Sequence, residues 1–183
     1  MRKVVIITGA SRGIGRQCAI DLSYDYDVVI NYNKSENEAK ELLEIVKNKG
    51  SNAIMIRADV SDREQVDSMV DKVVSYYGRI DALINNAGIA RQELFTDVKS
   101  EDMKKMTDIN LGGVFNCTQA VLKEMINKKQ GRIINMSSAL VNPTIAAFVA
   151  EYTTSQDAPQ IPHTLDIFII LPCFLFIISL STA

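Results

Sequence analysis

A glycine-rich stretch at residues 8–15 has the residue types and spacing to hold a phosphate group. It follows a short apolar run at residues 4–7, which is typical of a buried parallel strand, and it precedes a segment with helical spacing. In α/β folds such a turn receives a dinucleotide, and the helix N-terminus faces the phosphates. Gly9 would allow a tight exit from the strand, Gly13 a close approach to a pyrophosphate and Gly15 close packing of the helix. The alternative is a glycine turn that holds no ligand.

The residues after the second predicted strand, at 28–30, indicate which dinucleotide is preferred. A carboxylate there would bind the ribose hydroxyls of NAD and would repel a 2′-phosphate. Residues 31–34 are Asn-Tyr-Asn-Lys instead, and Arg12 lies in the glycine-rich stretch nearby. Two cations and no acid favour NADP, and the less favoured alternative is that Lys34 is only a solvated loop charge.

Polar side chains also follow two later strands, predicted at residues 82–84 and 133–134. The sequence after the first of these is Asn-Asn-Ala-Gly (85–88), and after the second it is Asn-Met-Ser-Ser (135–138). Because the carboxyl ends of parallel strands meet at the ligand-bearing edge of a sheet, these amides and hydroxyls are candidates for binding and catalysis. A simple turn and a helix cap are the alternatives.

The elements that must position these residues are predicted as strands alternating with helices. Strands are expected at residues 3–8, 28–30, 53–56, 82–84 and 133–134, and helices at 13–23, 36–49, 61–77 and 100–127. The apolar face of the first helix includes Ile14, and Ser61 with Glu64 predicts a capping box. Asn110, followed by Gly112 and Gly113, predicts a kink and a close packing partner in the last helix. This alternation predicts an α/β fold with a doubly wound parallel sheet.

Composition limits the classes of function. With 183 residues and a net charge of -2, the chain suits one globular domain and does not favour nucleic acid as a partner. Three cysteines without metal spacing, Cys18, Cys117 and Cys173, suggest reduced thiols and no metal site. No signal peptide is evident at the N-terminus, and we therefore expect a cytoplasmic protein.

Several motifs occur together in a specific order and at specific intervals. They are Thr8-Gly9-x-x-x-Gly13-x-Gly15, Asp59-Val60, Asn85-Asn86-Ala87-Gly88, Asn110 and Ser138. Over about residues 1–157 they resemble the short-chain dehydrogenase/reductase family, most closely the beta-ketoacyl-acyl-carrier-protein reductases. The resemblance implies a Rossmann-type fold, here truncated at its C-terminal side, that uses NADPH to reduce a ketone. The substrate would be a small molecule or a 3-oxoacyl thioester on an acyl carrier.

The resemblance also implies roles for individual residues. Ser138 would hydrogen-bond the substrate carbonyl, Tyr152 would give a proton to the alcohol, and Asn110 would hold a water in a proton relay. The implied cofactor-binding residues are Gly9, Ser11, Arg12, Gly13, Ile14, Gly15, Lys34, Asp59, Val60, Asn86, Ala87 and Gly88.

One position departs from the family pattern. The family has a lysine four residues after the tyrosine, where it lowers the tyrosine pKa and holds the nicotinamide ribose, and this chain has Gln156. Glutamine can hydrogen-bond a ribose hydroxyl but has no charge to stabilise a tyrosinate, so we expect low activity. A non-catalytic NADP-binding or interaction module is the alternative. Relatives usually form tetramers through the helix at 100–127 and the one after Tyr152, and the changed second helix argues against assuming a homo-oligomer here.

The resemblance ends near residue 157, and residues 158–183 form a divergent apolar tail. Every Lys and Arg lies at or before Arg132, and every Pro lies at or after Pro143. Three interpretations are open: a membrane anchor, for which the apolar run is short and lacks basic flanks; a replacement element covering the sheet edge after the fifth strand; and a shifted reading frame. The composition change and the missing lysine favour the third.

Overall fold

The computed structural model describes residues 2–90, 97–136, 165–171 and 174–179. Its elements, in chain order, are β1 (Lys3–Ile7), α1 (Gly13–Leu22), β2 (Tyr26–Tyr32), α2 (Glu36–Asn48), β3 (Ile54–Arg57), α3 (Arg63–Tyr77), β4 (Ala82–Asn85), α4 (Ser100–Thr107), the π-helix η2 (Asp108–Gly112), α5 (Gly113–Lys128), β5 (Gly131–Met136), β6 (Leu165–Leu171) and β7 (Phe174–Ser179). The predicted α/β alternation is confirmed, with strand ends shifted by at most two residues.

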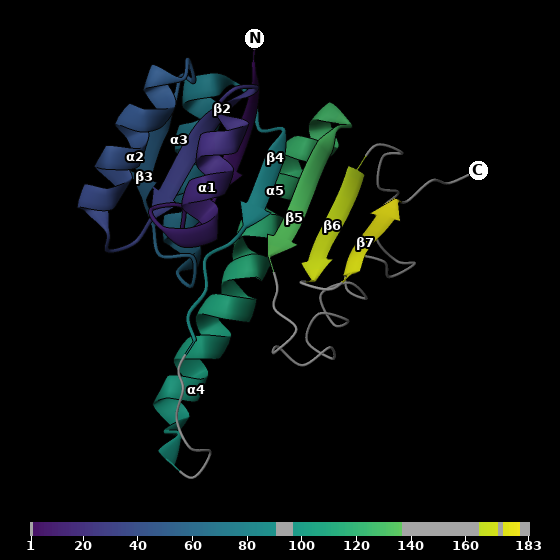
Figure 1. The fold of residues 1–183 in the computed structure, drawn as a ribbon. Coiled ribbons are helices and arrows are strands. Elements are labelled where there is room, and N and C mark those ends of the chain that lie inside the picture. The colour runs from purple at the N-terminus through teal and green to yellow at the C-terminus, as the bar shows by residue number, and fades with distance from the viewer. Residues whose placement is uncertain (1, 91–96, 137–164, 172–173, 180–183) are drawn as a thin grey trace.

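The strands form one sheet in the order β3-β2-β1-β4-β5-β6-β7 (Figure 1). The pairs from β3 to β6 are parallel, and β7 runs antiparallel to β6. Strand β1 therefore has β2 on one side and β4 on the other, and the strand order reverses between β1 and β4. In doubly wound sheets this switch point opens a crevice at the carboxyl ends of the strands.

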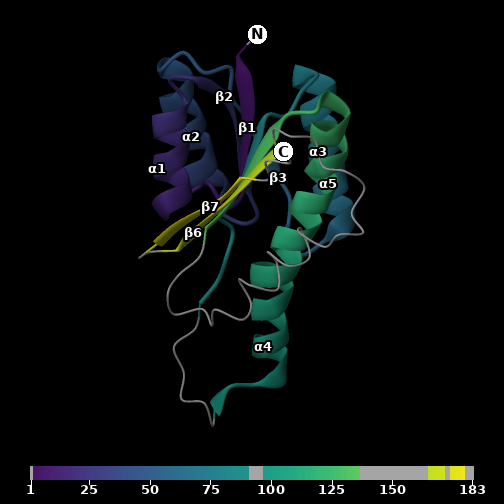
Figure 2. The same cartoon turned by 90° about the vertical axis from the view of Figure 1, so that its right-hand side faces the viewer.

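Two helical layers cover the sheet, α1 and α2 on one face and α3 and α5 on the other (Figure 2). Strand β1 is buried on both faces, since Val4 and Ile6 contribute to the core under α3 and α5, whereas Val5 and Ile7 contribute to the core under α1 and α2. This two-sided burial explains why β1 is continuously apolar rather than alternating.

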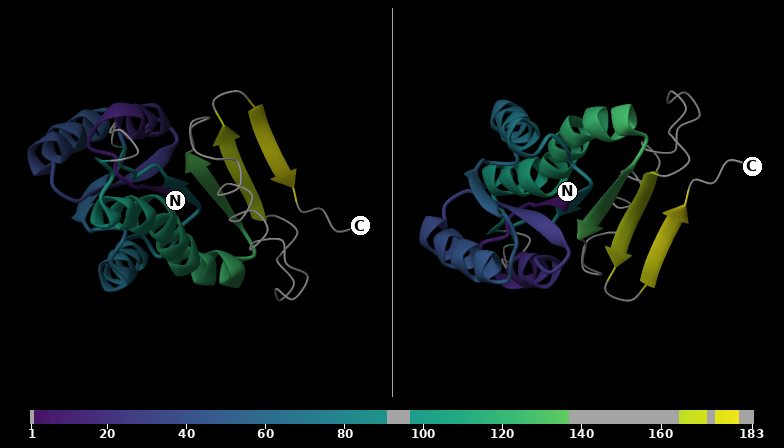
Figure 3. Two further views of the ribbon diagram at one scale, coloured as in Figure 1. Left: turned by 90° about the horizontal axis from the view of Figure 1, so that it is seen from below. Right: turned by 90° about the horizontal axis from the view of Figure 1, so that it is seen from above.

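The apolar tail contributes two strands to the sheet. Strand β6 lies beside β5 in parallel register, with Ile133 opposite Ile167, and β7 pairs with β6 in the antiparallel sense. Both strands lie to one side of the helical layers (Figure 3). This is the arrangement expected of a replacement element at the edge beyond β5, and the reading-frame interpretation stays a hypothesis. Among the helices that the structure describes, none is long and apolar enough to cross a membrane.

Two local predictions about helix α1 and helix α3 are wrong. Ile14, in the first turn of α1, is 64% exposed, whereas Gly15 and Ala19 are the buried residues of this helix. Asp62, not Ser61, is the N-cap of α3, where its carboxylate accepts a hydrogen bond from the backbone N–H of Gln65.

The helix predicted at residues 100–127 is interrupted, as its asparagine and glycines indicated. A π-helical turn, η2, separates α4 from α5. The close packing partner is Val60: a Cβ added at Gly113 would lie 2.6 Å from the Val60 Cγ2. α4 has no buried residue and projects beyond the carboxyl edge of the sheet (Figure 1).

Candidate functional site

A cavity of about 810 Å³ lies at the carboxyl ends of β1, β2, β3 and β4. We call it the carboxyl-edge cavity. Its lining residues come from four loops and from the α4–η2 segment: Gly9, Ser11, Arg12, Gly13, Asn31, Tyr32, Asn33, Lys34, Ser35, Ala58, Asp59, Val60, Asn86, Ala87, Gly88, Ile89, Ala90, Lys105 and Ile109. All the predicted cofactor residues are among them except Ile14 and Gly15.

The loops after β1 and β4 are held together by Thr8 and Asn86. The Thr8 Oγ1 accepts hydrogen bonds from the backbone N–H groups of Asn86 and Ala87, both at 2.9 Å. In return, the Asn86 Nδ2 donates to the carbonyl oxygens of Thr8, at 2.9 Å, and Gly9, at 3.1 Å. These four bonds fix the position of the glycine loop relative to the second loop, so the cavity wall is preformed.

Each of the three glycines that follow β1 is explained by a different feature of the structure. Gly9 has φ +61°, and an added Cβ would lie 2.9 Å from the Ala87 Cα. Gly13 has φ +58°, and among the described residues outside its own helical turn none comes within 4 Å of the position its Cβ would take, so this side of its backbone is open there. Gly15 is buried against the Asn86 side chain, because its Cβ would lie 2.4 Å from the Asn86 Nδ2. Gly15 therefore acts behind the cavity wall rather than on it.

Asn31 supports the glycine loop, a role that the sequence did not reveal. Its side-chain Oδ1 accepts from the Gly9 N–H at 3.2 Å, and its backbone oxygen accepts from the Ala10 N–H at 2.9 Å. Its Nδ2 donates to the Ala58 carbonyl at 3.0 Å. The sequence treated this position only as one without a carboxylate, whereas in the fold the buried amide links the loops after β1 and β3.

The charged groups around the cavity are mostly cationic. Its lining includes Arg12, Lys34 and Lys105, and Asp59 is the single carboxylate among these lining residues. Partial burial opposes ionisation of Asp59, but hydrogen bonds from Ser61 and Asn33 and the charge of Lys34 prevail, and the pKa of the Asp59 carboxyl is lowered. Three donors thus hold this carboxylate: the Ser61 N–H, the Ser61 hydroxyl and the Asn33 amide, at 3.0, 2.6 and 2.7 Å.

Asn110 attaches the kinked helix to the cavity wall. Its Oδ1 accepts from the Ile89 N–H, and its Nδ2 donates to the Ile89 carbonyl, both at 2.9 Å. On the other side of the kink, the Asn116 Nδ2 donates to the Val60 carbonyl at 3.0 Å. Asn110 does not line the cavity. Ser138, Tyr152 and Gln156 lie outside the described residues, so the structure does not place them.

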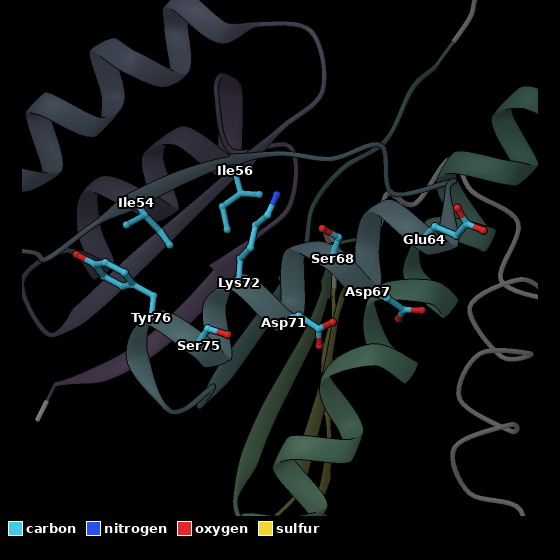
Figure 4. Close-up of a pocket in the computed structure, with 9 residues that line it drawn as sticks. All are labelled: Ile54, Ile56, Glu64, Asp67, Ser68, Asp71, Lys72, Ser75 and Tyr76. Atoms are coloured by element: carbon cyan, nitrogen blue, oxygen red, sulfur yellow. The ribbon is translucent and has the colours of Figure 1, made fainter.

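A second hollow, of about 820 Å³, lies between the edge strand β3 and helix α3. In Figure 4 the Lys72 side chain extends from α3 toward Ile56, while the carboxylates of Asp67 and Asp71 point away from Ile56. Asp67 is already paired with Arg63 at 2.9 Å. These side chains do not converge on a common point, so the carboxyl-edge cavity is the stronger candidate for a binding site.

Comparison with known proteins identifies the family to which the chain belongs. The family model for short chain dehydrogenase matches residues 3–160. The chain therefore belongs to the short-chain dehydrogenase family, as the motifs suggested.

Individual relatives show how far the similarity extends. The chain is 42% identical over 154 residues to the 3-oxoacyl-[acyl-carrier-protein] reductase FabG of Staphylococcus aureus (strain N315), covering 82% of this chain and 63% of that protein. It is 44% identical over 138 residues to the 3-oxoacyl-[acyl-carrier-protein] reductase of Synechocystis sp., covering 74% and 56%. The solved structure "ElxO with NADP Bound" matches with a TM-score of 0.71 and 34% identity, covering 82% of this chain and 65% of that one. The chain thus spans less than two thirds of the length of these relatives.

Proposed function

We propose that the chain binds NADP in the carboxyl-edge cavity and is a reductase of ketones, with a 3-oxoacyl thioester on an acyl carrier as substrate. The single observation behind this proposal is the cavity itself. It joins the Gly13 backbone to two cations, Arg12 after β1 and Lys34 after β2, and residues 31–34 carry no carboxylate of their own that would repel a 2′-phosphate. The similarity to an NADP-bound structure and to 3-oxoacyl reductases supports the same choice.

The residues present fit the cofactor. The Gly13 backbone can approach a pyrophosphate, since the space beside it is open, and the N-terminus of α1 faces the same loop. Asp59 and Val60 line the part of the cavity in which we place the adenine. Asn86, Ala87 and Gly88 line the part in which we place the ribose. The Arg12 guanidinium has no hydrogen-bond or salt-bridge partner within the described part of the chain. It is therefore available for a phosphate.

Bound NADPH would supply a hydride to the substrate carbonyl. In the proposed site Ser138 orients that carbonyl, Tyr152 gives the proton, and Asn110 supports the relay. With Gln156 in place of the lysine, the cation that the family pattern supplies four residues after Tyr152, and that would favour its ionised form, is missing from the sequence. Removing one preorganised group of this kind lowers turnover by about 10²–10³-fold.

Gln156 also supports a second candidate, an NADP-binding module without catalysis. The test is NADPH oxidation with an acetoacetyl thioester, measured for the chain and for Gln156→Lys. The reductase proposal predicts slow turnover that the lysine raises at least tenfold. No turnover in either form, with NADPH still bound, would leave the binding module. Turnover within tenfold of a full-length relative would contradict the role assigned to position 156.

A further inference from the structure

We propose that Lys105, on α4, is a cofactor-binding residue that adds a third cation to the cavity for the pyrophosphate charge of the dinucleotide. This inference rests on the proposed function, because it names a residue for the same cofactor. It goes further in one respect, since neither the motifs nor the family resemblance points to α4 as a source of cofactor contacts.

Lys105 is part of the cavity wall even though it lies on a projecting helix. It lines the cavity together with Ile109, four residues later, and with Ile89 and Ala90 from the loop after β4. Residues four apart on a helical segment lie on the same face. The α4–η2 segment therefore turns one face toward the cavity, and Lys105 is the charged residue of this segment that lines it.

The position of this face is set by contacts within the kink and at the start of α5. Asn110 makes two hydrogen bonds to the backbone of Ile89, both at 2.9 Å. Gly113 packs against Val60, whose carbonyl accepts a hydrogen bond from Asn116. Ile89 and Val60 are themselves cavity residues. Because η2 and the start of α5 are attached to the wall at these two points, Lys105, five residues before Asn110, lies in the cavity lining.

The two adjacent lysines of α4 differ in their partners. The Lys104 ammonium forms a salt bridge with Asp108 at 2.6 Å. The Lys105 ammonium has no hydrogen-bond or salt-bridge partner within the described part of the chain. Asp59, the carboxylate of the cavity lining, already accepts three hydrogen bonds from Ser61 and Asn33. The Lys105 charge is therefore available for an anionic ligand.

Sheet topology separates Lys105 from the two other cations. Arg12 and Lys34 follow β1 and β2, while α4 is attached to the loop after β4, on the other side of β1. Arg12 and Lys34 are thus placed to distinguish a 2′-phosphate, whereas Lys105 approaches from the opposite side. We infer that Lys105 attracts the charge that NADPH and NADH share, the pyrophosphate.

The test compares Lys105→Gln with Lys104→Gln, which remove the same charge from neighbouring residues. Dissociation constants for NADPH and NADH are measured by cofactor fluorescence in the full chain, at low and high salt, after melting temperatures confirm folding. Lys105→Gln is expected to weaken both cofactors about fivefold at low salt, and less at high salt. Lys104→Gln is expected to change either constant less than twofold, and Lys105→Arg to retain affinity.

Three results would overturn the inference in distinguishable ways. Equal effects of Lys105→Gln and Lys104→Gln would show that only net charge matters. A loss confined to NADPH would assign Lys105 to the 2′-phosphate instead. If the unmodified chain binds neither cofactor, the proposed function fails first and the inference falls with it.

Discussion

Gly15 offers a quantitative test of how the cavity wall is built. A Cβ added by Gly15→Ala would lie 2.4 Å from the Asn86 Nδ2, so the amide must withdraw by about 1 Å to reach van der Waals contact at 3.4 Å. The two hydrogen bonds from this amide, to the carbonyls of Thr8 and Gly9, would then be lost. At about 1 kcal/mol each, they amount to about 2 kcal/mol of stability. The helix preference of alanine offsets up to about 1 kcal/mol of that loss.

The matching variant is Asn86→Ala, which removes the amide that the new Cβ would meet. Alone, it is expected to lower the free energy of unfolding by about 2 kcal/mol, because the same two hydrogen bonds are lost. In this background the new Cβ no longer meets the amide but still lies 3.0 Å from the Gly9 carbonyl oxygen, a tight contact, so with the helix preference of alanine Gly15→Ala is expected to be close to neutral. The double variant should therefore be more stable than the sum of the single effects by about 2 kcal/mol.

The assay is urea denaturation of the four proteins, with the free energy of unfolding extrapolated to water. Effects that add to within about 0.5 kcal/mol would refute the reasoning, because independent sites behave in that way. A Gly15→Ala variant as stable as the parent would likewise show that the helix and the loop after β4 are not in the close contact described.

Two further predictions concern the core under α5. Gly113→Ala should destabilise the chain by about 1–3 kcal/mol in urea denaturation, because its Cβ would overlap Val60. Gly112→Ala is the control and should not destabilise the chain, since the nearest neighbour of its Cβ lies at 3.8 Å. Equal effects of the two variants would contradict the packing of Gly113 against Val60. Burial raises the pKa of the Cys117 thiol to about 12, above its ordinary value of 9.0. The neutral thiol therefore contributes its full share of the free energy of unfolding below pH 9, and this contribution is lost as the pH rises toward 12. The free energy of unfolding should therefore fall less steeply over this range in Cys117→Ala than in the parent, and identical slopes would contradict the shift.

Much of the architecture follows from patterns that are local in the sequence. The run at residues 4–7 and the glycines after it define β1 and its loop, because a strand buried on both faces is continuously apolar and a sharp exit needs positive φ. The kink near Asn110 was also predictable, since Gly112 and Gly113 allow close approach of the backbone. That the kink takes the form of a π-helical turn was not, because it depends on attachment of Asn110 to Ile89, 21 residues earlier.

The details that the sequence did not reveal all depend on tertiary contacts. Ile14 fits the apolar spacing of α1 but lies in its first turn, where the described part of the chain leaves it 64% exposed. Ser61 and Asp62 are both good N-caps, and Ser61 is not used because its hydroxyl and N–H bind Asp59. Lys105 has no motif at all. Its role in the cavity follows only from where the kink directs α4.

The most direct test of the central claim is a calorimetric titration of the full chain with NADPH and with NADH at the same ionic strength. Arg12 and Lys34, with no carboxylate among residues 31–34, predict that NADPH binds at least about tenfold more tightly. Equal affinities would contradict the assignment of these two cations to the 2′-phosphate. Binding of neither dinucleotide would contradict the assignment of the carboxyl-edge cavity itself.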